Sequence, residues 1–195
     1  MKLIFATQNR HKLNEVSAIL GKDIELVSLP DLDFHDELPE THATLEENAE
    51  EKSRFVYDRF KSNCFAEDTV LEVKALLGAP GVYSARYAGE GKNSDDNINL
   101  LLHQLGGEKN RRARFRTVIS LILEGKNHFF EGITEGTISA ARCGEGGFGY
   151  DPVFIPEGHV LSYAEMPPEL KNKISHRRKA FEKMNAFLHE AGKIR

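Results

Sequence analysis

The alternation of hydrophobic and polar residues predicts strands and helices that interleave along the chain. A short apolar run at Leu3–Ala6 indicates a buried first strand. Polar residues 7–12 follow, and apolar residues then recur at helical spacing from Leu13 to Leu20, with Gly21 as the expected end of that helix. Residues 23–29 alternate as a half-exposed strand does. The chain therefore opens with a strand, a polar loop, a helix and a second strand.

The next segment predicts a loop, a helix and a central strand. Residues 30–43 are rich in proline and acidic residues and read as a loop. Thr44 and Glu47 have capping-box spacing, so a helix is expected to begin there and to bury one face that includes Lys52. Residues 64–73, CFAEDTVLEV, then read as a strand.

The second half predicts further strands, turns and helices. The expected elements are a turn-rich segment at 78–89, a helix capped by Ser94, a hairpin of 115–123 with 128–138, a Gly-rich loop at 142–158 leading into a strand at Pro152–Ile155, and a last helix capped by Ser175. No repeat or linker interrupts them, so residues 1–195 read as a single α/β domain. We expect a mixed central sheet flanked by helices, in which the hairpin half forms a second lobe.

Composition narrows the class of protein. The 195 residues carry a net charge of −4, which weighs against a general nucleic-acid binder. The two cysteines, Cys64 and Cys143, form no CxxC pair, which favours a reducing compartment. The apolar run near the N-terminus is too short for a signal peptide or a membrane span. We therefore expect a cytoplasmic protein with no membrane partner.

The polar loop at Thr7–Lys12 is the first candidate site. A loop between a strand and a helix start offers backbone N–H groups and the positive end of the helix dipole, and Arg10 and Lys12 add charge. A phosphate group is the natural ligand. The loop lacks the GxxxxGK[ST] pattern of a P-loop, and an ordinary helix cap would look similar.

The acidic pair Glu67–Asp68 is the second candidate. Neighbouring residues of a strand face opposite sides of the sheet, so one carboxylate could be held in an ion pair while the other meets a ligand. Mg²⁺ commonly takes one or two carboxylates, waters and substrate phosphates. A second carboxylate could come from Asp36–Glu37, Glu40 or Glu46–Glu47. A buried ion pair with Arg or Lys is the alternative.

Two later segments could recognise a base. In GEGGFGYDPVF, glycines would let a ligand approach the backbone, and Phe148 and Tyr150 are expected to expose rings that stack on a base. Asp151 precedes a proline and should be extended. In ELKNKISHRRKAF, His176 and Arg177 stand at a helix start, where we expect them to point outward as hydrogen-bond donors.

In their order and spacing these segments resemble the inosine triphosphate pyrophosphatase family, also called Ham1-like. The resemblance covers essentially the whole chain and rests on the stretches FATQNRHKLNEV, ETHATLEENAEEK, AEDTVLEV, GAPGVYSARYAG, GGFGYDPVF and KNKISHR. It implies an Mg²⁺-dependent hydrolysis of ITP, dITP or XTP to the monophosphate and pyrophosphate. It also implies an elongated mixed sheet, two lobes with a cleft between them that holds the substrate, and a homodimer.

The resemblance assigns roles to particular residues. Asp68 corresponds to the catalytic general base and metal contact, and Glu40 to a second metal-associated acid. Residues that correspond to substrate contacts are Thr7, Gln8, Asn9, Arg10, His11, Lys12, Thr69, Phe148, Gly149, Tyr150, Asp151, Lys171, His176 and Arg177.

Two departures from the family pattern keep alternatives open. Glu67 stands where the family commonly has Asp, and Val70 where it usually has Gly. Val does not adopt positive φ comfortably, so a nucleotide sensor without catalysis is one alternative. A Maf-like pyrophosphatase for modified pyrimidine nucleotides is another. An RNA-binding module on the basic run 109–116 is a third, although the acidic balance argues against a stable nucleic-acid partner.

Overall fold

The computed structural model describes residues 1–20 and 22–194, and its chain divides into two compact units. Unit 1 comprises Met1–Asp68, Thr117–Gly132 and Arg177–Arg195, and unit 2 comprises Thr69–Arg116 and Ile133–His176. The chain thus changes unit directly after Asp68 and directly after His176. Gly21, the expected end of the first helix, lies outside the described residues.

Strands and helices interleave as the sequence pattern predicts. The strands are β1 (Lys2–Phe5), β2 (Glu25–Ser28), β3 (Cys64–Val73), β4 (Pro80–Gly81), β5 (Arg112–Leu123), β6 (Lys126–Ile138) and β7 (Phe154–Pro156). The α-helices among the described residues are α1 (Arg10–Ile19), α2 (Leu45–Phe60), α3 (Ser94–Leu105), α4 (Pro168–Ile174) and α5 (His176–Glu190). No helix in the described part of the chain is long and apolar enough to cross a membrane.

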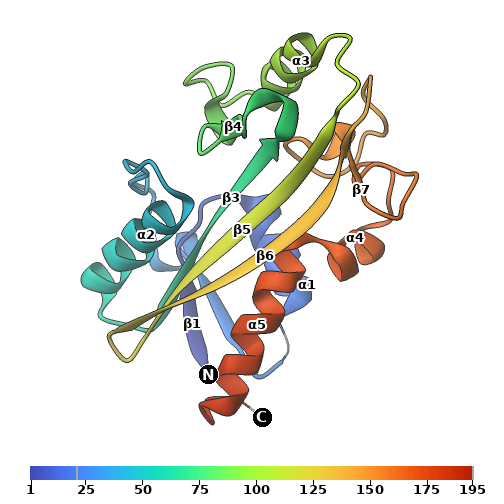
Figure 1. Cartoon of the computed structure of the whole chain (residues 1–195). Coiled ribbons are helices and arrows are strands. Elements are labelled where there is room, and N and C mark those ends of the chain that lie inside the picture. The colour runs from blue at the N-terminus through green and yellow to red at the C-terminus, as the bar shows by residue number, and fades with distance from the viewer. Residues whose placement is uncertain (21, 195) are drawn as a thin grey trace. The chain divides into compact units, whose positions relative to one another are not determined.

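The strands form one mixed sheet, which confirms the predicted α/β class. Their order is β2-β1-β3-β5-β6-β7, and β4 pairs with β3 (Figure 1). β1 runs parallel to both β2 and β3, whereas the β3–β4 and β6–β7 pairs are antiparallel. The register of β1 on β3 places Phe5 opposite Phe65. This pairing positions the segment of β3 that carries Glu67 and Asp68.

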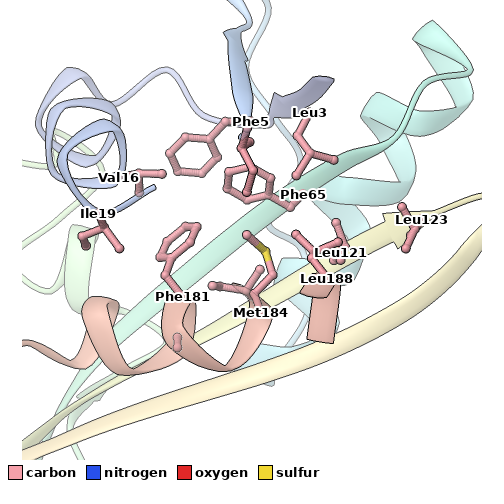
Figure 2. Packing of buried hydrophobic residues seen from close by; sticks show 13 residues of the cluster. Leu3, Phe5, Val16, Ile19, Phe65, Leu121, Leu123, Phe181, Met184 and Leu188 are labelled. Atoms are coloured by element: carbon pink, nitrogen blue, oxygen red, sulfur yellow. The ribbon is translucent and has the colours of Figure 1, made fainter. Parts of the chain in front are cut away.

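In unit 1, the two faces of β3 pack against different helices. Phe65 stacks on Phe5 with ring centroids 4.6 Å apart and meets Phe181 of α5 edge-on. Figure 2 shows this cluster, in which Val16 of α1 also takes part. Ala66, on the opposite face, belongs to a second cluster that contains Val56 of α2. Because side chains alternate along a strand, Glu67 follows Phe65 toward α1 and α5, and Asp68 follows Ala66 toward α2.

Unit 2 has its own aromatic core. Phe115, Phe154 and Tyr163 pack together, with centroids of Phe115 and Phe154 4.7 Å apart. Apolar side chains of α3, including Leu101, join the same cluster. The core holds the Gly-rich segment that follows β6, because Tyr150 and Val153 are buried in it.

Several predicted boundaries shift. Asn93, not Ser94, caps α3, because its Oδ1 accepts the N–H groups of Asp95 and Asp96. The strand expected at Pro152–Ile155 begins only at Phe154, since Asp151–Val153 form a 3-10 turn. Helix α4 was not predicted, because its seven residues are too few to show a helical period.

Val70 does not disturb the backbone where the family usually has Gly. It lies in the regular strand β3 and is 3% exposed. The residues with positive φ in the described chain do not include it. A β-branched side chain suits a buried strand position, so the local geometry that Gly would permit is not needed in this chain.

Candidate functional site

A buried charge cluster surrounds Glu67 in unit 1. Both carboxylate oxygens of Glu67 accept from Nε of Arg177, at 3.0 and 2.8 Å, and Nη2 of Arg177 donates to Oε1 at 2.8 Å. The ammonium of Lys12 lies 3.3 Å from the same carboxylate. Arg177 also donates to Glu15 of α1. The cluster therefore ties the start of α5 to β3 and to the first turns of α1.

The charges in this cluster stabilise each other. Burial alone would raise the pKa of Glu67, but Arg177 and Lys12 outweigh it and lower that pKa to about 2. Burial alone would lower the pKa of Arg177, and Glu67 and Glu15 raise it instead. The expectation that one member of the acidic pair forms a buried ion pair is confirmed for Glu67. The expectation that Arg177 points outward is wrong, because its side chain is 1% exposed and turned toward Glu67.

On the opposite face of β3, Lys52 joins two carboxylates. Its Nζ donates to Oε1 of Glu40 at 2.7 Å and to Oδ1 of Asp68 at 3.1 Å. Lys52 is 4% exposed and stands on the buried face of α2, whereas the Asp68 side chain keeps 13% of its surface exposed. The two acids predicted to hold a metal thus converge on one ammonium, although one comes from a loop and the other from a strand.

The same contacts keep Lys52 charged. Burial alone would lower the pKa of Lys52, but Asp68 and Glu40 outweigh burial and raise it. An ammonium in this place offsets the repulsion between the two carboxylates. Sequence reasoning put Lys52 on the buried helix face without a functional role. A lysine at a core position of an amphipathic helix was the signal that could have marked it.

Glu40 and Asp68 are the residues of this cluster that could hold a magnesium ion. Among the described residues no group of three or more His, Cys, Asp or Glu is arranged to hold a metal ion. Mg²⁺ needs only one or two carboxylates when water and substrate phosphates complete its octahedron. Glu40 and Asp68, which both contact the ammonium of Lys52, supply the two carboxylates that such a site would use.

The polar loop before α1 is already hydrogen-bonded. Oδ1 of Asn9 accepts the N–H groups of His11 and Lys12 at 2.9 and 3.2 Å, and Oγ1 of Thr7 accepts the N–H of Asn9 at 3.2 Å. Gln8 donates to the carbonyl of Asp36. The expectation of free backbone donors is therefore wrong for the N–H groups of Asn9, His11 and Lys12. To bind those of His11 and Lys12, a phosphate would have to displace the Asn9 side chain. Gln8, Arg10 and His11 are exposed.

In unit 2, Lys171 lies between a carboxylate and two rings. Its Nζ is 2.5 Å from Oδ2 of Asp151, 4.8 Å from the ring centroid of Phe148 and 5.5 Å from that of Tyr163. Lys171 and Asp151 are both buried, and Phe148 is partly exposed. Three residues that the resemblance assigns to the substrate, Phe148, Asp151 and Lys171, therefore meet in this unit.

The position of the Asp151 side chain explains why residue 147 of the Gly-rich loop is a glycine. Oδ2 of Asp151 accepts the N–H of Phe148 at 2.8 Å, which folds the loop tightly over Gly147. Gly147 has a φ of +71°, and a Cβ there would lie 2.1 Å from the Asp151 carboxylate. Gly147 thus makes room for the protein's own carboxylate, whereas we had expected the glycines to make room for a ligand.

Two predicted side-chain orientations in unit 2 are wrong. Tyr150 does not expose its ring: it is 5% exposed, and its hydroxyl donates to the carbonyl of Ser84 at 2.9 Å. His176 is 3% exposed and stacks on Phe115 with centroids 4.6 Å apart, so it does not point outward. The rings of Tyr150 and His176 both lie in apolar surroundings. Ser175, the expected cap of α5, directly precedes that helix and also ends α4, because its N–H donates to the carbonyl of Lys171.

The basic run 109–116 has structural partners. Nε of Arg111 donates to the carbonyl of Ile138 at 2.8 Å and its Nη2 to that of Ser139 at 2.7 Å. Arg114 pairs with Glu72. These contacts favour a structural role for the run over an RNA-binding surface.

The sequence model of the Ham1 family matches residues 3–187. The chain belongs to the Ham1 family.

Named relatives of this Ham1-family chain match it over nearly its whole length. It is 55% identical to a dITP/XTP pyrophosphatase of Porphyromonas gingivalis over 188 residues, which cover 96% of this chain and 97% of that protein. It is 50% identical to a dITP/XTP pyrophosphatase of Flavobacterium johnsoniae over 184 residues, or 94% and 96% of the two chains. The structure of the Staphylococcus aureus Ham1 protein matches with a TM-score of 0.88 and 38% identity, covering 98% of this chain and all of that one.

The Glu67 cluster predicts an acid-sensitive part of the stability. Glu67→Gln should lower the free energy of unfolding at neutral pH by about 3–5 kcal/mol, because it leaves buried cations without their anion. Since the pKa of Glu67 is lowered from 4.5 to about 2 on folding, its contribution is complete above the unfolded value and is lost as the pH falls toward 2. Urea unfolding across this acid range should therefore show a weaker pH dependence in Glu67→Gln than in the wild type.

Glu72→Gln is the matched control for this prediction, since Glu72 is a carboxylate of the same strand that pairs with the half-exposed Arg114. It should cost about 1 kcal/mol or less. Equal losses in the two variants, or an unchanged acid profile in Glu67→Gln, would contradict the role of the cluster.

Proposed function

We propose that this chain hydrolyses non-standard purine nucleoside triphosphates, ITP, dITP and XTP, to the monophosphate and pyrophosphate, and so clears them from the nucleotide pool. The proposal rests on one observation: Lys52 donates to both Glu40 and Asp68, and the carboxylate of Asp68 is partly exposed. The names of the relatives from Porphyromonas gingivalis and Flavobacterium johnsoniae support the substrate class.

Asp68 is the residue to which we assign the proton transfer. Its carboxylate keeps some exposure, so it can meet a water molecule, and it is oriented by the ammonium of Lys52 at 3.1 Å. As general base it would accept a proton from the water that attacks phosphorus. Lys52 holds the base in place and brings positive charge toward the phosphate oxygens, where negative charge develops.

Glu40 and Asp68 are the residues that would hold Mg²⁺. Bound there, the ion would spread the charge of the phosphates and orient them for attack. Arg10 and Lys12 stand at the N-terminal turn of α1, where we place the phosphates. Because Asn9 caps that turn in the structure, we expect phosphate oxygens to take over the N–H groups of His11 and Lys12.

Base recognition is assigned to residues of unit 2. Phe148 is partly exposed and is the ring we expect to stack on the purine. Lys171, whose ammonium lies beside the Phe148 ring, carries N–H donors that suit the 6-keto group of hypoxanthine and xanthine. Adenine presents an amino donor instead, and a buried unpaired donor costs about 1–3 kcal/mol, which favours the keto purines. Thr69 and Gly149 complete the proposed contacts, and Asp151 holds the ammonium of Lys171 beside them.

Two further properties belong to this proposal. We expect a homodimer, as the resemblance to the family implies. We also expect the enzyme to work in the cytoplasm, where the nucleotide pool lies.

A panel of triphosphates tests the activity. With Mg²⁺ present, ITP, dITP and XTP should be cleaved to pyrophosphate faster than ATP, because adenine lacks the 6-keto group. The pyrimidine nucleotides dTTP and UTP should be poor substrates, because Phe148 is proposed to stack on a purine. GTP shares the 6-keto group and is included to measure selectivity that the proposed donors do not supply. Products are identified by separate assays for pyrophosphate and orthophosphate. Release of orthophosphate alone, or a preference for pyrimidine nucleotides, would refute the function. Tight binding of ITP without hydrolysis would instead indicate a nucleotide sensor.

Asp68→Asn tests the general base. The amide cannot accept the proton of the attacking water, so kcat should fall by about 10²–10⁴-fold. The shape of the side chain is kept, so the Kd for ITP measured by calorimetry should stay within a few-fold of the wild type. Glu72→Gln on the same strand should leave both values unchanged. A near-normal kcat in Asp68→Asn would remove Asp68 from this role.

Lys52→Met tests the bridging ammonium. Removing it should lower kcat by about 10²–10³-fold, as loss of one charge-stabilising donor does in other enzymes. The Kd for ITP should change less than kcat, because the ammonium is proposed to act mainly on the charge that develops during the reaction. Lys61→Met, an exposed lysine that follows the same helix and pairs with Asp58, is the control. A near-normal kcat in Lys52→Met would show that the reaction does not need this ammonium.

A further inference from the structure

Glu40 lies in a loop. Side chains of α2 that have no role in the proposed mechanism hold this loop in place. Residues 37–42 have no regular secondary structure, so the backbone around Glu40 is not fixed by a helix or a strand. Loops of this kind are the more mobile parts of a domain. The carboxylate of Glu40 lies in such a loop and has to contact both Lys52 and a metal. It therefore needs further contacts that fix its position.

Glu51 and Asn48 supply two anchors directly after Glu40. The carboxylate of Glu51 accepts both groups of Thr41, the N–H at 2.9 Å and the hydroxyl at 2.8 Å. Oδ1 of Asn48 accepts the N–H of His42 at 2.9 Å, and its Nδ2 donates to the carbonyl of His42 at 3.1 Å. Two consecutive loop residues are thus each held by a pair of hydrogen bonds.

The anchors stand on the same helix face as the catalytic lysine. Asn48, Glu51 and Lys52 are related by three and four residues, which places them side by side on α2. Asn48 is 2% exposed, and the side chain of Glu51 is 21% exposed. One rigid helix therefore carries Lys52 and also fixes the loop whose Glu40 bonds to it at 2.7 Å.

We propose that Glu51 and Asn48 are positioning residues, which hold Glu40 where it contacts Lys52 and would meet the metal. The inference rests on the proposed function and deepens it. The anchors remove most of the conformational freedom of the loop before the metal arrives, so less ordering is left to oppose binding. Groups that orient a metal ligand from behind typically contribute about 10–100-fold to metal affinity.

Glu51→Ala is the variant that tests the anchor, and Mn²⁺ is the probe. Its Kd is measured by electron paramagnetic resonance, with and without inorganic tripolyphosphate, which supplies phosphate oxygens without a base. We expect the Kd to rise by about 10–100-fold in Glu51→Ala. Hydrogen exchange at the amides of Thr41 and His42 should become faster in the same variant, because the Thr41 N–H loses its acceptor.

Two variants separate positioning from charge. Glu51→Gln keeps an oxygen for the Thr41 N–H and an amide donor for the hydroxyl oxygen, so it should restore the Kd to within a few-fold of the wild type. Glu50→Ala removes a neighbouring carboxylate that pairs with Arg54 instead of the loop, so it should change neither readout. Thr41→Val, at an exposed position, removes one of the four bonds and serves if Glu51→Ala does not fold.

An Mn²⁺ affinity that stays at the wild-type value in both Glu51→Ala and Thr41→Val would overturn the proposal. So would a loss of affinity in Glu51→Gln as large as in Glu51→Ala, because charge and not position would then matter. A wild-type protein that binds no Mn²⁺ even with tripolyphosphate would also overturn it. These readouts need no nucleotide turnover, so a failure of the proposed function appears separately, in the triphosphate panel.

Discussion

The alternation of side chains along β3 is the constraint on which the site depends. Glu67 and Asp68 are neighbours in sequence, yet the pleat sends one toward α1 and α5 and the other toward α2. A buried carboxylate is costly unless a cation and hydrogen bonds meet it. Arg177 and Lys12 meet Glu67, and Lys52 meets Asp68. The two faces of one strand therefore separate a closed structural charge cluster from a partly exposed carboxylate.

The two clusters differ in what they leave available for chemistry. Around Glu67 the carboxylate is fully enclosed, and its lowered pKa marks a group that stays ionised and does not exchange protons near neutral pH. Asp68 keeps exposed surface and shares its cation with Glu40, a loop residue. A general base needs access to water, and a metal ligand needs a partner ligand. Only the second arrangement offers both, which is why we assign the reaction to Asp68 and a supporting role to Glu67.

Sequence reasoning located the candidate segments better than it oriented their side chains. The strand at 64–73 and the capping box at Thr44 are confirmed at the predicted residues. Tyr150, His176 and Arg177 were expected to face outward and are buried, because a loop and a helix start can be covered by a core that only the folded chain assembles. Asn9 was expected to contact substrate, and the structure adds that its Oδ1 caps α1, since its side chain reaches the helix N–H groups locally.

The sequence by itself determined the α/β class, the opposite facing of Glu67 and Asp68, and membership of a motif family, because these follow from periodicity and from the order of short segments. The tertiary structure decided which cation meets each carboxylate. Lys52 lies 16 residues from Asp68 in the chain, and Arg177 lies 110 residues from Glu67. Ion pairs between residues so far apart in the chain depend on how the helices pack on the two faces of the sheet. The local sequence pattern does not predict that packing.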